Sequence, residues 1–398
     1  MVFETCKKIK ELDKYCQIFL FSPNREYDEH FLKRVSNPYN IRVCGYHQDR
    51  LFLKYLNMIH DLFIIVLFSL LKPFSIKRIP FRGSLPRTFM DVDVILEIAG
   101  ISFTDNLGLR NAINSAFRML SAKILERKYL CLPQSYGPSS NLLIRILAKI
   151  GLNTTAHIMP RGHMSIKFLK EIGVNSSRMT FVPDLAFSYE NPDKYYRENV
   201  YKRLRISSSH KYIAVLPNVH LYRWLGDKIL EILKAVIDNL ITLDYTVILI
   251  PHELSGDAKT LDDKFICDLL HKKVKNKEKV ILISDELTAN EIKSLIALCD
   301  FVIASRYHAM ISALKMKVPP IVIGWANKYH ETMELFSLTD FVIKYNTLNE
   351  VELINKIYLL LHERNIIIEK IQREVTKYER ASEIFKEILR NEIYEKHQ

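Results

Sequence analysis

The sequence has few glycines, and none is placed as in a phosphate-binding loop. Its 398 residues include 11 glycines, and no two of them form a Gly-x-Gly pair. A dinucleotide-binding turn and a P-loop both need characteristically spaced glycines, because the backbone must approach the phosphates closely. Both kinds of loop are therefore excluded, and a nucleotide cofactor is disfavoured.

Paired cysteines are also lacking. The six cysteines stand singly, mostly beside apolar residues: Cys6, Cys16, Cys44, Cys131, Cys267 and Cys299. No Cys-x-x-Cys occurs, so neither a zinc site nor a redox pair is indicated. Isolated thiols are typical of a reducing compartment, and the first residues do not read as a signal peptide. We therefore expect a cytoplasmic protein without a metal.

Apolar runs of membrane-spanning length do not occur either. Residues 62–71 (LFIIVLFSLL) form an apolar run of about half the ~20 residues that a spanning helix needs. We expect a buried helix here. The alternative is a helix in the membrane interface, aided by the basic residues Lys72, Lys77, Arg78 and Arg82. That alternative would make the protein peripheral at the inner face of the membrane.

The overall composition indicates a folded protein with an acidic partner. Hydrophobic residues make up 48% of the chain and charged residues 26%, as in globular proteins of two ordinary domains. The net charge of +12 suits acidic ligands or an anionic membrane surface. No basic run is interleaved with aromatics, so a nucleic-acid partner is not expected. The composition leaves the oligomeric state open.

Strand-like and helix-like runs alternate along most of the chain. In the first half, strands are expected at 92–98, 129–132, 155–158 and 179–182, with helices at 109–124, 142–150 and 164–172. In the second half, strands are expected at 212–216, 246–250, 279–283, 301–304 and 321–323, with helices at 228–240, 261–270, 290–298 and 308–315. Such alternation predicts crossover connections and parallel sheets.

A polar stretch separates the two halves. We expect an N-terminal α/β domain over residues 1–188, a linker over 189–210, a second α/β domain over 211–346 and a helical C-terminal segment over 347–398. The predicted fold is two Rossmann-like parallel-sheet domains that face a cleft, as in the GT-B architecture, followed by a long C-terminal helix. Ligands would bind at the carboxyl ends of the strands.

The most informative polar residues follow the predicted strand 301–304. Arg306 and His308 stand at this strand end, directly before a helix. A helix start favours an anion through its free N–H groups and partial positive charge. Arg306 can bind two oxygens of a phosphate or carboxylate, and His308 can transfer a proton near neutral pH.

This segment resembles the polysaccharide pyruvyl transferase family. The matching residues are Asp300-Phe301-Val302-Ile303, Arg306-Tyr307-His308, Lys317-Val318-Pro319 and Lys328. Four further motifs are similar to those of the family: LPQSYGP at 132–138, PRGHMS at 160–165, FVPDLAF at 181–187 and IPH at 250–252. Their order and spacing agree with the family over roughly residues 92–341.

The sequence departs from the family pattern at three places. Gly162 replaces the Asp that usually follows the Arg of the second motif, and Ala99-Gly100 stands where two glycines are more frequent. The family also begins with a strand and a Gly-Asp turn, whereas this chain opens with an expected helix at residues 4–15. We therefore expect the first strand of the N-terminal domain to be missing and the acceptor contacts to differ.

The resemblance implies transfer of a pyruvyl group from phosphoenolpyruvate to two hydroxyls of a sugar, which forms a cyclic ketal. The sugar would belong to a cell-surface polysaccharide or its lipid-linked precursor, with phosphoenolpyruvate as co-substrate and no cofactor. The implied roles are acid–base catalysis by His308, donor binding by Arg306, Lys328 and His252, and acceptor-side contacts by Arg161, Asp184, Gly100 and Gln134. Asp184 could alternatively cap the turn that follows it.

Two other functions stay open at this point. One is a GT-B glycosyltransferase that uses a nucleotide sugar, which the lack of a glycine-rich loop disfavours. The other is a non-catalytic glycan-binding relative, which the joint presence of Arg306, His308 and Lys328 disfavours.

Overall fold

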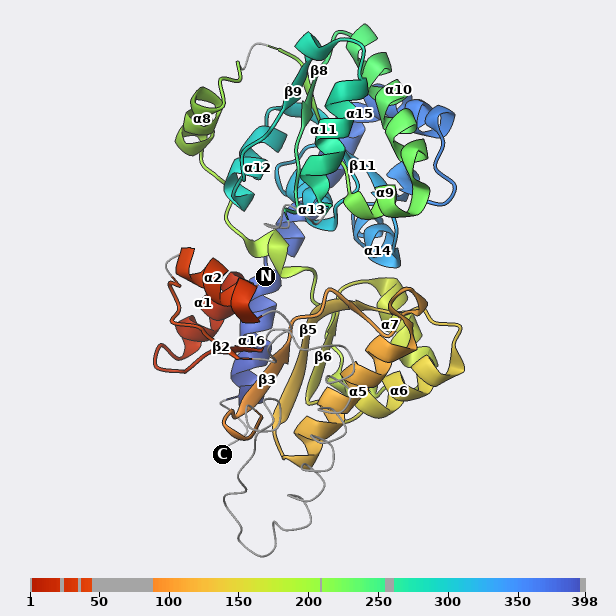
Figure 1. Ribbon diagram of the computed structural model, residues 1–398. Helices are drawn as coiled ribbons and strands as arrows, with labels where there is room; N and C mark the ends of the chain where they lie inside the picture. Colours follow the sequence, from red (N-terminus) through yellow and green to blue (C-terminus); the bar gives the residue numbers. More distant parts are fainter. Residues whose placement is uncertain are drawn as a thin grey trace, which may run out of the picture. The chain divides into compact units, whose positions relative to one another are not determined.

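The computed structural model describes residues 2–21, 25–34, 37–44, 89–207, 210–254 and 261–393 (Figure 1). The chain forms two compact units, Met1–Leu185 with Ala381–Gln398, and Ala186–Arg380. The apolar run at 62–71 lies outside the described residues. Within the described part of the chain, no helix is both long and apolar enough to cross a membrane.

The first unit contains two parallel sheets. Its N-terminal elements are α1 (Val2–Leu12), β1 (Phe19–Phe21), α2 (Arg25–Arg34) and β2 (Arg42–Cys44), with β1 and β2 paired in a small sheet. The main sheet consists of β3 (Val94–Glu97), β4 (Ile101–Ser102), β5 (Lys128–Tyr136) and β6 (His157–Pro160). The long β5 pairs with β3 and β4 through its two halves and with β6 on its other side.

Helices cover both faces of β5. Tyr129 and Cys131 point into one core with α5 (Gly108–Ile124), α6 (Leu142–Leu152) and α7 (His163–Glu171). Leu130 and Leu132 point into the opposite core, which α16 (Ala381–Ile393) completes with Phe385. This alternation is the two-residue period of a strand that is buried on both faces.

The second unit is a doubly wound sheet. Its strands are β7 (Tyr212–Leu216), β8 (Thr246–Leu249), β9 (Val280–Leu282), β10 (Cys299–Ala304), β11 (Pro320–Gly324) and β12 (Val342–Lys344). All pairs are parallel, and the spatial order is β12-β11-β10-β7-β8-β9. In chain order this is the 3-2-1-4-5-6 arrangement of Rossmann folds. The predicted α/β class is confirmed.

The helices of the second unit connect or flank these strands. They are α8 (Lys194–Arg203), α9 (Val219–Leu225), α10 (Asp227–Thr242), α11 (Asp263–Lys273), α12 (Ala289–Ile296), α13 (Tyr307–Lys315), α14 (Asn327–Leu335) and α15 (Glu350–Tyr378). In Figure 1, α9, α13 and α14 gather at one end of this unit.

Three sequence-based expectations need correction. The stretch 189–210 is more than a linker, because Asp193 caps α8 and this helix packs on α12 within the second unit. The stretch 347–398 holds two helices, and the second, α16, belongs to the first unit. Residues 179–182 run beside β6, yet only Met179 forms a bridge, to Ile158, so no strand is formed there.

Candidate functional site

A pocket opens at the carboxyl edge of the six-stranded sheet. Its volume is about 500 Å³, and we call it the strand-end pocket. The lining residues follow the ends of β7, β8, β10 and β11: Asn218, His220, His252, Glu253, Arg306, Tyr307, His308, Trp325, Lys328 and Tyr329. Strands β7 and β10 are neighbours at the point where the strand order reverses. Ligands of doubly wound sheets bind at this point.

The four residues expected on the donor side all line this pocket. Arg306 and His308 come from the start of α13, Lys328 from the start of α14, and His252 from the loop after β8. The chain brings them together because the carboxyl ends of parallel strands meet at one edge. Their chemical roles stay predictions.

Arg306 is already held by two carboxylates. Its Nε donates to Oδ2 of Asp263 at 2.8 Å, and its Nη2 donates to Oδ1 at 2.6 Å. The Asp263 side chain is fully buried, and its two oxygens also accept the backbone N–H groups of Val219 and Glu253. The third guanidinium nitrogen, Nη1, donates to Glu253, whose side chain is 64% exposed.

These contacts limit the part of Arg306 that a ligand can reach, and its donor-binding role stays a prediction. The Nε–Nη2 edge, which would bind two donor oxygens, is occupied by Asp263. Only the side that faces the exposed Glu253 remains for a ligand. Asp263 and Glu253 were not predicted as site residues, although acidic residues between a strand end and a helix start are a signal visible in the sequence.

The Lys328 ammonium lies among three aromatic rings. Its Nζ is 4.8 Å from the ring centre of Trp325, 5.0 Å from that of Tyr307 and 5.7 Å from that of Tyr329. Cation–π attraction holds the ammonium against these rings at the pocket wall.

Two helices begin at the pocket without a side-chain cap. The N-cap residue of α13, Arg306, and that of α14, Ala326, form no side-chain cap hydrogen bond. Asn218 and Asp262, by contrast, cap the neighbouring helices α9 and α11. His308 and Lys328 are each the second residue of an uncapped helix. Both helix starts therefore direct N–H groups and partial positive charge toward this region, which favours an anion.

Two histidines of the pocket have lowered pKa values. Burial, followed by the charges of His308 and Arg306, lowers the pKa of His252 from 6.5 to about 3. Burial, followed by Arg306 and Arg223, also lowers the pKa of His220. His252 is therefore neutral at physiological pH and can contribute a hydrogen bond to a donor but no charge. His308 is exposed and lies edge-on to Tyr307, with 5.5 Å between ring centres.

The expected acceptor-side residues meet inside the first unit. The Arg161 side chain donates to Asp184 at 2.6 Å, to the Gly100 carbonyl at 2.6 Å and to Ser135 Oγ at 2.9 Å. Arg161 and Asp184 are each 2% exposed. Arg161 and Asp184 thus form a buried ion pair, and their contact with the acceptor stays a prediction.

Gln134 is equally enclosed. Its side-chain oxygen accepts from Ser102 at 3.0 Å, and its nitrogen donates to Tyr136 at 2.8 Å and Glu97 at 3.2 Å. Gly100 differs, because a Cβ added there would meet no described atom within 4 Å. Of the four expected acceptor-side residues, Gly100 alone has open space beside it in the described structure.

Gly137 is the residue that shapes the turn after β5. Its φ is +58°, and an added Cβ would lie 2.5 Å from the Phe168 ring. Only glycine fits both conditions. The glycine of the LPQSYGP motif is thus explained by packing.

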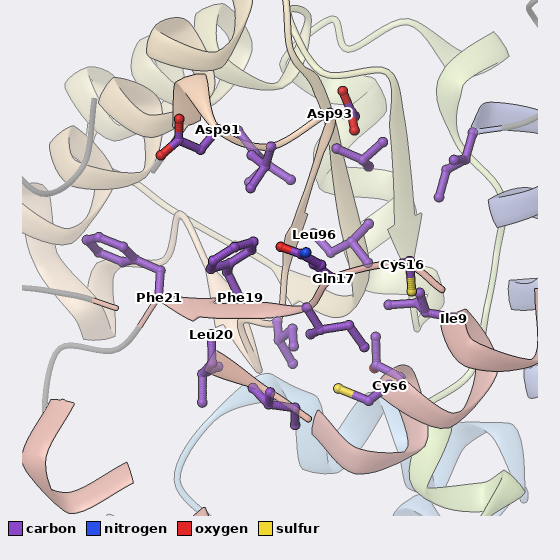
Figure 2. Close-up of a pocket in the computed structure, with 18 of the residues that line it drawn as sticks. Cys6, Ile9, Cys16, Gln17, Phe19, Leu20, Phe21, Asp91, Asp93 and Leu96 are labelled. Carbon is purple, nitrogen blue, oxygen red and sulfur yellow. The ribbon is translucent and has the colours of Figure 1, made fainter. Parts of the chain in front are cut away.

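A second pocket of about 720 Å³ lies within the first unit (Figure 2). Phe19 and Phe21 from β1 and Leu96 from β3 line it, with Asp91 and Asp93 at its margin. None of the site residues expected from the sequence lines this second pocket. No group of three or more potential metal ligands is found among the described residues of either unit.

Solved structures share this architecture. HepE from Anabaena in complex with UDP superposes with a TM-score of 0.58 at 15% identity, over 98% of this chain and 95% of that chain. A glycosyltransferase from Rickettsia africae gives a TM-score of 0.60 at 13% identity, over 98% and 94%. MnaA of S. aureus with UDP gives 0.56 at 12%, over 94% and 95%. At these identities the likeness shows the fold, which is GT-B-like.

Sequence similarity is more specific. The amylovoran biosynthesis protein AmsJ of Erwinia amylovora is 21% identical over 289 residues, which cover 71% of this chain and 69% of that protein. Residues 9–327 match the sequence model of the polysaccharide pyruvyl transferases. The chain therefore belongs to the polysaccharide pyruvyl transferase family, and it is a transferase.

Proposed function

We propose that the enzyme transfers the pyruvyl group of phosphoenolpyruvate to two hydroxyls of one sugar and forms a cyclic ketal. The sugar belongs to a cell-surface polysaccharide or to its lipid-linked precursor. The observation that carries this proposal is the strand-end pocket, in which Lys328 and two uncapped helix starts surround one space. Phosphoenolpyruvate carries two anionic groups, a carboxylate and a phosphate, and both need positive partners.

The reaction defines what the pocket must supply. The terminal enol carbon gains a proton and becomes a methyl group, while the central carbon forms two bonds to sugar oxygens. The bond between that carbon and the phosphate oxygen breaks. The two hydroxyls release two protons, of which one balances the methyl group and the other leaves with phosphate. An acid and a base are therefore required, together with a group that holds the anions.

His308 is the best-placed group for proton transfer. It lines the pocket, is exposed, and stands at the start of α13, where a bound anion would lie beside it. His252 stays neutral and can orient the donor through a hydrogen bond. Asp263 fixes Arg306, and the Nη1 side of the guanidinium can contact the donor once Glu253 moves aside.

A nucleotide-sugar glycosyltransferase is the second candidate. The observation that favours it is the fold, since HepE and MnaA were solved with UDP. The family membership and the scarcity of glycines count against it. We also propose that the enzyme is cytoplasmic, because all six cysteines are free thiols. There it meets a lipid-linked acceptor at the inner face of the membrane.

One assay separates these functions. Purified protein is incubated with phosphoenolpyruvate and a panel of glycans, and inorganic phosphate is measured. Release of phosphate that depends on both substrates supports the proposal. Release of UDP from a UDP-sugar, with no phosphate from phosphoenolpyruvate, would establish the glycosyltransferase instead.

A further inference from the structure

Of the two tryptophans of the protein, Trp325 lines the strand-end pocket and Trp224 packs against Trp325. The chain has two, Trp224 at the end of α9 and Trp325 after β11, and their ring centres are 5.8 Å apart. Trp224 is also 5.1 Å from the Tyr345 ring and stacks on His220 at 5.9 Å. We call Trp224, Trp325, Tyr345 and His220 the aromatic ledge. Trp325 and His220 line the pocket itself.

The ledge presents an apolar surface to solvent. Trp224 is 49% exposed, although an indole gains most by being buried. A large aromatic side chain that is half exposed beside a pocket is accessible to a ligand bound there.

The ledge is also uncharged, in contrast to the rest of the pocket. Its only titratable ring near neutral pH, His220, has a lowered pKa and is therefore mostly uncharged at neutral pH. Lys328 lies at the border between the ledge and the rest of the pocket, because its ammonium lies against Trp325. The pocket thus has a cationic half, formed by Lys328 and the starts of α13 and α14, and a neutral aromatic half. An anion fits the first half and an uncharged ring fits the second.

The proposed reaction requires such a neutral ligand next to the donor. Both sugar hydroxyls must reach the central carbon of the donor, so the sugar has to lie against the anion-binding half. The pocket volume of about 500 Å³ lies within the range of sites for drug-sized ligands, well beyond the needs of a three-carbon acid. Three of the four residues expected to contact the acceptor in the first unit are buried, namely Arg161, Asp184 and Gln134.

We propose that the aromatic ledge is an acceptor subsite that binds a neutral pyranose ring by stacking the ring's C–H face on Trp224 and Trp325. The identity of this sugar as the pyruvyl acceptor rests on the proposed function, whereas its binding to the ledge does not. Aromatic rings bind such faces through a combination of apolar contact and the negative potential of the ring.

The test uses the tryptophans as the reporter, since both belong to the ledge. Intrinsic fluorescence is titrated with the methyl pyranosides of glucose, galactose and mannose, with phosphoenolpyruvate and with UDP. A pyranoside should change the emission in a saturable way. Trp224→Ala and Trp224→Leu should weaken pyranoside binding, read by calorimetry, by about tenfold, and Trp224→Phe by less. Phosphoenolpyruvate binding should change less than twofold in all three.

The matched control is Tyr358→Ala, which removes an aromatic residue that is 47% exposed on α15, outside the pocket. It should bind pyranosides as the wild type does. Equal pyranoside affinity in Trp224→Ala and Tyr358→Ala, in variants with wild-type circular dichroism, would overturn the proposal. So would saturable quenching by UDP with none by any pyranoside, which would assign the ledge to a nucleobase. Pyranoside binding that needs Trp224, without phosphate release from phosphoenolpyruvate, would uphold the ledge and refute the proposed reaction.

Discussion

Asp263 holds Arg306, which lines the strand-end pocket, in a two-point ion pair with hydrogen bonds of 2.8 and 2.6 Å. The same carboxylate accepts the backbone N–H groups of Val219 and Glu253, which follow β7 and β8. One buried aspartate thus joins the ends of three neighbouring strands. The pair therefore sets the shape of the pocket as well as the orientation of Arg306.

Asp263→Asn should destabilise the second unit strongly. The neutral amide leaves the Arg306 guanidinium without its anionic partner. Breaking a buried ion pair in this way typically lowers the free energy of unfolding by about 3 kcal/mol or more. Asp262→Asn is the matched control, because Asp262 caps α11 and asparagine caps a helix equally well. Urea unfolding followed by tryptophan fluorescence reports this unit, which contains both tryptophans. Equal midpoints for the two variants would contradict the assigned role of Asp263.

Arg161 and Asp184 should behave as a structural pair. Arg161→Met or Asp184→Leu alone leaves one buried charge without its partner and should cost about 3–5 kcal/mol. The double variant should be more stable than either single variant, because it buries no charge. Thermal unfolding followed by circular dichroism gives the stabilities of the wild type, the two single variants and the double variant. Single variants with wild-type stability and a raised KM for the glycan would instead show that these residues contact the acceptor.

His252 should make stability depend on pH. Its pKa is lowered from 6.5 to about 3 in the folded protein, so between these values the unfolded chain binds a proton that the folded protein does not. Stability must then fall as the pH is lowered through this window, with a slope of up to about 1.4 kcal/mol per pH unit. His308 and Arg306 face this imidazole and add to the effect. His252→Gln should show a shallower slope in urea unfolding at several pH values, and parallel curves would refute the assignment.

His308 and Arg306 should separate catalysis from binding. His308→Gln should lower kcat by about 10²–10⁴-fold with little change in donor affinity, because it removes the proton-transfer group. Arg306→Lys should weaken donor binding, since an ammonium cannot hold Asp263 at two points and also face the pocket. His362→Gln, an exposed histidine on α15, should leave both constants unchanged.

Kinetics of phosphate release and donor calorimetry on these variants would distinguish the outcomes. An equal loss of donor affinity in His308→Gln and Arg306→Lys would make His308 a binding residue. Wild-type kinetics in both would remove the start of α13 from the active site.

The elements best predicted from the sequence are the buried strands and amphipathic helices. The expected strand 212–216 coincides with β7, and the expected helix 308–315 lies within α13. Helix α8 was missed because its sequence, KYYRENVYKR, buries little apolar surface, with Val200 as its buried residue. Strand β12 was not predicted, because three residues are too few to show the periodicity of a strand.

The site was predictable only in part. Arg306, His308, Lys328 and His252 follow strand ends, so the topology alone brings them to one edge. The contacts of Asp263 with Arg306, and of Trp224 with Trp325, join residues far apart in the sequence, and no periodicity reports such pairs. Conversely, similarity to the family motifs predicted Arg161, Asp184 and Gln134 as site residues, and their burial is visible only in the structure.

Thermal protection by phosphoenolpyruvate tests the central claim most directly. At about 100 times its dissociation constant, a donor that binds the folded protein should add roughly 2.7 kcal/mol of stability, which is a clear rise in Tm. Lys328→Met should lose this protection, whereas Lys344→Met, an exposed lysine on β12 outside the pocket, should keep it. Protection by a UDP-sugar with none by phosphoenolpyruvate would contradict the account.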